Sequence, residues 1–124
     1  MSLVIDDVMS RVKIIEFINK NIDKENNYFL EIGALHNPWL KDIINPNNIR
    51  YLDFTTTEQL QINYKNDPNV DITKIVNVDY ILDSSKIYSE YINEKFNLVF
   101  SSHNIEHQPD IITHLNNVES ILVD

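Results

Sequence analysis

Four positions in the chain place a residue with useful chemistry at the end of an apolar run. Gly33, the only glycine, closes the run that begins at Tyr28, and Asp53 closes a second run twenty residues later. Glycine permits backbone turns that other residues resist, and an acidic residue at about this distance holds a ribose in nucleotide-binding α/β sheets. Asp83 and Ser101 close two further apolar runs. The pattern predicts a ligand site, and the competing interpretation is an ordinary turn at Gly33 with helix caps or solvated loops at the aspartates.

A histidine-containing segment suggests a second chemistry. His103, Glu106 and His107 match His-x-x-Glu-His, in which two histidines of one helix hold zinc and the glutamate acts as base. An apolar run ends just before His103 and Pro109 follows, so any helix between them would be about one turn long. This context disfavours zinc hydrolysis. Two interpretations stay open: His103 or His107 serves a reacting group, or Glu106 and His107 hydrogen-bond nearby backbone.

The elements that must position these residues alternate between helix and strand. Valine and isoleucine recur every three or four residues at the start of the chain, which predicts an amphipathic helix over residues 4–22. Apolar runs bounded by Asn, Pro and Asp predict four strands, over residues 28–32, 49–54, 75–82 and 96–101. Helices are expected over residues 38–44, 56–65 and 86–91, and from residue 108 onward.

Local signals refine three of these helices. Pro38 suits the first turn of the helix at 38–44, and Thr55 with Glu58 forms a capping box for the helix at 56–65. His36 is expected to shape the loop after Gly33, and His114 is expected on the surface of the last helix. The apolar side of that helix is made up of Ile111, Ile112, Leu115, Val118 and Leu122.

The alternation of strands and helices predicts a parallel sheet with right-handed crossovers and helices on both faces. Ligands of such sheets bind beyond the carboxyl ends of the strands. Those ends carry Glu31 with Gly33, then Asp53, Asp83, and Ser101 with Ser102. Since three of the four ends are acidic, they suit hydroxyl groups, an amine or a sulfonium cation better than phosphate.

Composition narrows the class of protein. The 124 residues suit one domain, and a net charge of −9 without a basic stripe disfavours nucleic acid and anionic membranes as partners. The sequence has no cysteine, no apolar run of about 20 residues and no signal-peptide pattern, so a cytoplasmic location is expected. Four aromatic residues are expected to pack in the core rather than stack on nucleic acid, because no basic groove accompanies them: Trp39, Tyr51, Phe54 and Tyr80.

Three blocks of the sequence, in this order, resemble class I S-adenosylmethionine-dependent methyltransferases. The resemblance is closest to a bacterial group with a Leu-Glu-Ile-Gly-Ala-Leu-His-Asn-Pro first motif. The blocks are residues 30–38, residues 50–53 with 57–60, and residues 96–107, and together they span residues 28–122. The resemblance implies one domain over 1–124, with a helix and loop over 1–27 and a partial core over 28–124. The expected fold is a Rossmann-like three-layer α-β-α sandwich with sheet order 3-2-1-4.

The resemblance also implies roles for individual residues. Glu31, Gly33 and Ala34 would form the loop beneath the methionine part of S-adenosylmethionine, and Asp53 would accept hydrogen bonds from the ribose. Phe54 would lie against the adenine, Asp83 and Ser84 near the adenine amine, and Ser101 and His103 near the reacting methyl group, with no metal. The implied reaction moves a methyl group by direct displacement to a small-molecule or sugar acceptor. The alternative is a non-catalytic binding or assembly module that keeps the fold.

Two departures from the family pattern bear on activity. The usual first motif has three glycines, and Leu35 and Asn37 stand in the later two places. Asparagine tolerates left-handed backbone, whereas leucine does not give the same close approach. The family also has seven strands, so the chain is expected to be truncated after the fourth strand or to complete its sheet through a partner. Without a fifth strand, the fourth is an open apolar edge, which predicts a homodimer through that edge or through the N-terminal helix.

Overall fold

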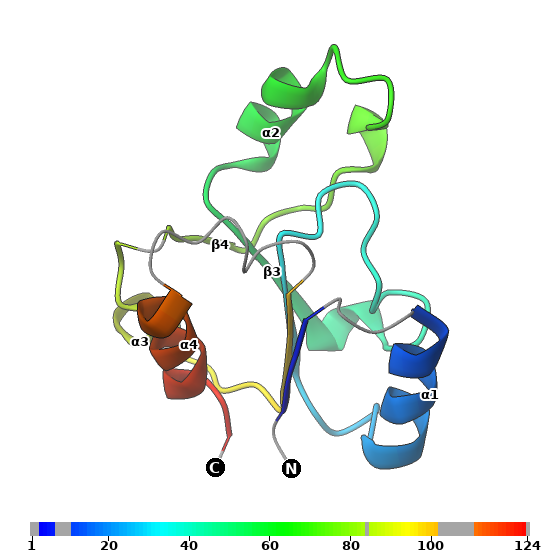
Figure 1. Cartoon of the computed structure of the whole chain (residues 1–124), viewed down its shortest axis with the longest axis vertical. Coiled ribbons are helices and arrows are strands. Elements are labelled where there is room, and N and C mark those ends of the chain that lie inside the picture. The colour runs from blue at the N-terminus through cyan, green and yellow to red at the C-terminus, as the bar shows by residue number, and fades with distance from the viewer. Residues whose placement is uncertain (1–2, 7–10, 84, 102–110, 124) are drawn as a thin grey trace.

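Five parallel strands form one sheet in the order β1-β5-β2-β3-β4 (Figure 1). The computed structural model describes residues 3–6, 11–83, 85–101 and 111–123. The strands are β1 (Leu3–Asp6), β2 (Phe29–Ile32), β3 (Ile49–Asp53), β4 (Tyr80–Ile81) and β5 (Leu98–Ser101). The helices are α1 (Arg11–Asn21), α2 (Thr57–Tyr64), α3 (Tyr88–Tyr91) and α4 (Ile111–Ser120), with 3₁₀ turns η1 (Pro46–Asn48) and η2 (Ile72–Lys74).

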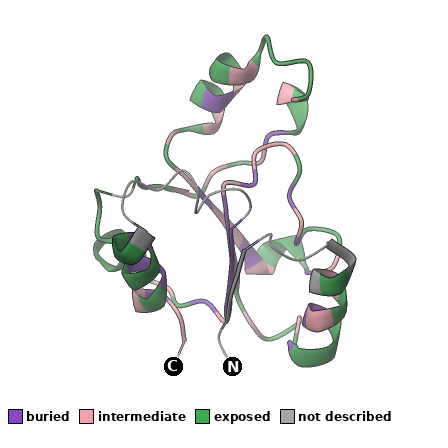
Figure 2. Ribbon diagram, viewed as in Figure 1, coloured by how far each residue is buried: buried purple, intermediate pink, exposed green. Residues whose placement is uncertain are grey.

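Helices cover both faces of this sheet, so the chain has three layers. Alternate residues of a strand point to opposite faces, and each face therefore has its own apolar cluster. On one face, Phe29 and Phe100 pack with Ile18 of α1 and with Leu40 of the segment after β2. On the other face, Leu30 and Val99 pack with residues of α3 and α4. Figure 2 shows the buried strands between these two exposed layers.

The strand order predicted from the sequence is confirmed. The four expected strands correspond to β2, β3, β4 and β5, and their order in the sheet is the predicted 3-2-1-4. All the neighbouring strands pair in parallel, as the alternation of elements requires. The carboxyl ends of β2, β3 and β5 consequently meet at one edge, where Ile32 lies in register with both Leu52 and Ser101.

The first part of the chain differs from the prediction. The helix expected over residues 4–22 is helical only over Arg11–Asn21, and Leu3–Asp6 forms β1 instead. This strand pairs in parallel with β5, from Leu3 opposite Leu98 to Asp6 opposite Ser101. β1 therefore covers the edge of β5 that was expected to be open. The structural argument for a dimer through that edge is wrong, and dimerisation itself stays a prediction.

The segment between β2 and β3 is not the helix expected over residues 38–44. Leu40 makes a single turn there, in which its carbonyl accepts hydrogen bonds from the N–H groups of Ile43 and Ile44 at 3.1 and 3.0 Å. The turn stops because Asn45 caps η1, which has Pro46 as its first residue.

The third predicted strand is shorter than expected, because the residues before it pair elsewhere. The hydroxyl of Thr57 donates to the Val76 carbonyl at 2.9 Å and accepts from the N–H of Val78 at 2.9 Å. β4 is left with two residues, opposite Leu52 and Asp53. The cap of α2 also differs by one position, since Thr56 rather than Thr55 accepts the hydrogen bond from the N–H of Gln59.

The last helix buries Val118 as predicted, but two other members of its predicted apolar face are exposed. Ile112 and Leu115 are 68% and 43% exposed, whereas His114 is buried at 1% exposure. His114 packs against the ring of Tyr88 edge-on, with ring centroids 6.3 Å apart. Asn117, also buried, accepts a hydrogen bond from the N–H of Tyr88 at 3.2 Å. His114 and Asn117, which contact α3, are therefore buried on this helix, whereas the apolar periodicity predicted that Ile112 and Leu115 would be.

Candidate cofactor site

The loop that follows β2 contains two residues with left-handed backbone. Gly33 has φ 70° and Leu35 has φ 53°. The N–H of Gly33 donates to the Leu52 carbonyl at 3.0 Å, which attaches the loop to β3, and the Leu35 carbonyl accepts from the N–H of Val76 at 3.0 Å. Left-handed backbone costs a residue with a side chain about 1–2 kcal/mol. The chain thus keeps a glycine-like conformation at Leu35, a position where the sequence predicted a loss of the glycine motif.

This loop exposes a run of backbone donors. Within the described part of the chain, the N–H groups of Ala34, Leu35 and His36 donate no hydrogen bond. Successive N–H groups in a turn with left-handed residues form a concave site for an anion such as a carboxylate or phosphate. The three N–H groups lie directly beyond the carboxyl end of the central strand β2, where ligands of parallel sheets bind.

Glu31 supports this loop from below. It is fully buried on β2, and its carboxylate accepts hydrogen bonds from the N–H groups of Trp39 and Leu40, each at 3.0 Å. A buried carboxylate needs such donors because leaving water otherwise destabilises its charge. Glu31 therefore fixes the course of residues 33–40, while Ala34 lies within the loop, itself buried.

Asp53 and Phe54 lie at the end of β3, beside the loop. One carboxylate oxygen of Asp53 accepts the N–H of Phe54 at 2.8 Å, and the other has no partner among the described residues. Burial raises the pKa of the Asp53 carboxyl, and the hydrogen bond from Phe54 lowers it by a smaller amount. A ligand that donates hydrogen bonds to this carboxylate would offset its desolvation. The side chain of Phe54 is 60% exposed, so the prediction that it packs in the core is wrong.

Asp83 closes a turn through hydrogen bonds within the chain. Its carboxylate accepts the N–H of Ser85 at 2.8 Å and also a hydrogen bond from the Ser85 hydroxyl. These two bonds lower the pKa of the exposed Asp83 carboxyl, as in other turns that an aspartate closes. Ser84, which the resemblance places beside it, lies outside the described residues.

Ser101 ends β5 next to the end of β2. Its side chain is 1% exposed, and the hydroxyl oxygen has no hydrogen-bond partner in the described chain. A buried hydroxyl without a partner is destabilising, and such groups occur where a ligand or water completes the bonding. His103, together with Glu106 and His107, falls in residues 102–110, outside the part that the structure describes. Among the described residues no group of three His, Cys, Asp or Glu could hold a metal ion.

The carboxyl edge thus brings together the loop after β2, Asp53 with Phe54, and Ser101, because β2 lies between β5 and β3. Neighbouring strands are about 4.8 Å apart. Sequence reasoning missed the donors of Leu35 and His36, since leucine gives no signal of left-handed backbone. The one available signal was the position of Leu35 at a place where the methyltransferases that the sequence resembles have glycine.

Comparison with solved structures shows which fold the chain has. The selenomethionine-substituted CurJ carbon methyltransferase superposes with a TM-score of 0.58 at 17% sequence identity, over 94% of this chain and 32% of that one. The chain has a methyltransferase-like fold. It spans about a third of the length of that structure. No family model and no curated protein matched the sequence. In the described residues no helix is long and apolar enough to cross a membrane.

Proposed function

We propose that the chain is an S-adenosylmethionine-dependent methyltransferase domain, or the cofactor-binding portion of one, that serves a small-molecule or sugar acceptor. The observation that carries the proposal is the loop after β2, where three successive backbone N–H groups without acceptors lie beside an underbonded, partly buried Asp53. The methyltransferase-like fold supports it, because this loop ends the strand at the centre of the sheet.

The residues present fit the parts of such a cofactor. The N–H groups of residues 34–36 would hold its carboxylate, since they are donors without other partners. Asp53 would accept the two ribose hydroxyls on its free carboxylate oxygen, and the exposed ring of Phe54 would cover the adenine. An acidic edge also favours a ligand that carries a sulfonium charge, because opposite charges attract across the partly buried site.

The chemistry that the cofactor supplies when bound is an electrophilic methyl group. This chain's own residues would bind, orient and exclude water. Glu31 fixes the loop through the N–H groups of Trp39 and Leu40, which keeps the three donors in place. Ser101 would offer its unpartnered hydroxyl beside them. Holding the two reacting groups in the correct orientation accounts for much of the rate acceleration of a displacement reaction.

The second candidate is a non-catalytic binding or assembly module with the same fold. The observation that favours it is the turn closed by Asp83, because its carboxylate is already engaged by Ser85 and its pKa is lowered without any ligand. In such a module Asp53 would also be only a loop residue, held by the N–H of Phe54.

Calorimetric titration of the 124-residue chain with S-adenosylhomocysteine distinguishes the two. We expect a micromolar dissociation constant that Asp53→Ala abolishes. The matched control is Asp67→Ala, since Asp67 accepts a backbone N–H from Asn69 at 2.9 Å much as Asp53 does from Phe54, but in the turn after α2. Millimolar or absent binding by the unmodified chain, or equal binding by the Asp53 variant, would favour the module.

A further inference from the structure

A hollow borders the first part of β3, and one of its lining residues, Val76, is hydrogen-bonded to Leu35 of the candidate cofactor loop. The hollow has a volume of about 460 Å³ and is lined by residues 46, 47, 49–51, 76, 77 and 79. Ile49 and Asp53 are four residues apart on one strand, which corresponds to about 13 Å. The hollow borders the first half of β3, where β4 does not reach because β4 pairs only with Leu52 and Asp53.

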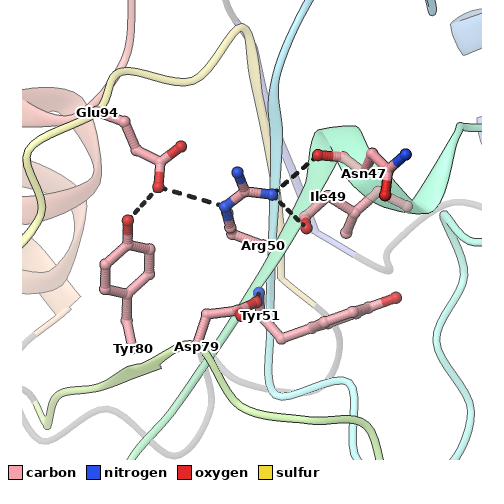
Figure 3. A network of polar contacts seen from close by, with 7 residues as sticks. All are labelled: Asn47, Ile49, Arg50, Tyr51, Asp79, Tyr80 and Glu94. Carbon is pink, nitrogen blue, oxygen red and sulfur yellow. Dashed lines mark hydrogen bonds and ion pairs between the residues drawn. The ribbon is translucent and has the colours of Figure 1, made fainter.

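The outward backbone groups of β3 at this hollow are already bonded. The N–H of Tyr51 donates to the Asp79 carboxylate and its carbonyl accepts the N–H of Asp79, both at 2.8 Å. The Ile49 carbonyl accepts from Arg50 Nη1 at 3.2 Å, and the N–H of Ile49 donates to Pro46. Figure 3 shows Arg50 bonded to Asn47 and Ile49, with Asp79 beside Tyr51. Because a docking strand needs free backbone groups, these bonds exclude addition of a peptide strand here.

Two residues of the lining are charged, and one of them is already paired. Arg50 Nε lies 3.4 Å from the carboxylate of Glu94, which also accepts a hydrogen bond from the hydroxyl of Tyr80 (Figure 3). Asp79 is the acidic residue of the lining and Arg50 the basic one. Because Arg50 is already paired with Glu94, it offers little charge to an anion, and the remaining charged group of the lining is the Asp79 carboxylate, which can accept hydrogen bonds from hydroxyl groups.

Several polar groups that line the hollow have no partner in the described chain. They are the side-chain amides of Asn47 and Asn77, the hydroxyl of Tyr51, and Arg50 Nη2. Burial and the nearby carboxylates of Glu31, Asp79 and Asp42 raise the pKa of the Tyr51 phenol to about 12, so it is protonated at neutral pH. The hollow thus offers both donors and acceptors, with one aromatic ring among them.

We propose that this hollow binds a neutral polyhydroxylated ligand, such as one sugar unit. Each hydroxyl of a sugar both donates and accepts, which matches side-chain amides and a phenol better than a charged group would. Tyr51 packs partly against the buried cluster around Ile49, and the part of its ring that stays accessible supplies an apolar surface for the C–H groups of the sugar. A volume of about 460 Å³ is in the range of small-ligand sites. The proposal does not depend on the proposed methyltransferase function.

The test is a two-dimensional ¹H–¹⁵N NMR titration of the full chain with glucose, galactose, N-acetylglucosamine and maltose, and with citrate and spermidine as charged comparators. We expect at least one neutral sugar to shift the side-chain amide signals of Asn47 and Asn77 saturably. Neither comparator should shift them. The doubly substituted Asn47→Ala, Asn77→Ala chain is followed through the backbone N–H signals of Tyr51 and Asp79 and should bind that sugar at least about tenfold more weakly, because each lost hydrogen bond weakens binding severalfold.

The control is Asn66→Ala, an exposed asparagine in the turn after α2, which should bind as the unmodified chain does. The backbone signals outside the hollow show whether each variant keeps its fold. The proposal is overturned if none of the four sugars shifts these signals at the highest concentration, if citrate or spermidine shifts them instead, or if the double variant binds equally well. The double variant should keep the response of the residue 34–36 backbone N–H signals to S-adenosylhomocysteine, which separates this outcome from that of the cofactor site.

Discussion

Because Leu35 has left-handed backbone, we expect glycine to be more stabilising than alanine at this position, the reverse of the usual order. In ordinary backbone, glycine is less favourable than alanine by about 0.5–1 kcal/mol, because it loses more conformational freedom on folding. At φ 53° alanine keeps a Cβ and so keeps the penalty of about 1–2 kcal/mol for left-handed backbone, which glycine lacks. Leu35→Gly should therefore be more stable than Leu35→Ala by about 0.5–1 kcal/mol. Both variants lose the same leucine side-chain contacts, so the comparison isolates the backbone.

Urea unfolding of the two variants measures this difference. With an unfolding slope of about 1–3 kcal/mol per molar urea, the midpoint for Leu35→Gly should lie about 0.2–1 M above that for Leu35→Ala, with equal slopes. The control pair is Leu115→Gly and Leu115→Ala in α4, an exposed helical position where alanine should be the more stable by about 1 kcal/mol. Equal or higher stability of Leu35→Ala would refute the left-handed conformation at Leu35 and the set of donors derived from it.

Three further substitutions test the packing around the site. Glu31→Ala should lower the free energy of unfolding by about 3–5 kcal/mol in thermal or urea unfolding, because it leaves two N–H groups without their charged acceptor, and Glu31→Gln should cost less. Asp53→Asn should raise stability at pH 7. A raised pKa means that the carboxylate destabilises the folded state above that pKa, so the gain should vanish below pH 3.8 in a pH series of unfolding measurements. The same variant should bind S-adenosylhomocysteine more weakly. Asn117→Ala should cost about 2–3 kcal/mol and speed hydrogen exchange at the N–H of Tyr88, since the amide of Asn117 joins that N–H to α4.

The sheet could be predicted from the sequence because its signals are local. Short apolar runs that end in Gly33, Asp53 and Ser101 are read correctly as strands, and the right-handed rule for crossovers then restricts their order. The early strand β1 was missed because Val4, its one valine, starts a series of apolar residues at helical spacing that continues into α1, and only pairing with the distant β5 distinguishes strand from helix.

The errors on the helices have a common physical origin in side chains that bond across the fold. His114 and Asn117 occupy buried places because they contact α3, a contact that periodicity in α4 alone does not reveal. Thr57 draws the segment before β4 away from the sheet. The donors of the candidate site were hidden for a similar reason. Leucine at a left-handed position contradicts its own preference and is held there by the surrounding structure.

The most direct test of the cofactor proposal is a ¹H–¹⁵N NMR titration of the 124-residue chain with S-adenosylhomocysteine. The account predicts saturable shifts of the backbone N–H signals of Ala34, Leu35 and His36, together with that of Phe54. The first three N–H groups would gain a carboxylate acceptor, and the N–H of Phe54 would share the Asp53 carboxylate with the ribose. No shift at these four positions at saturating ligand, or shifts confined to another part of the chain, would contradict the account.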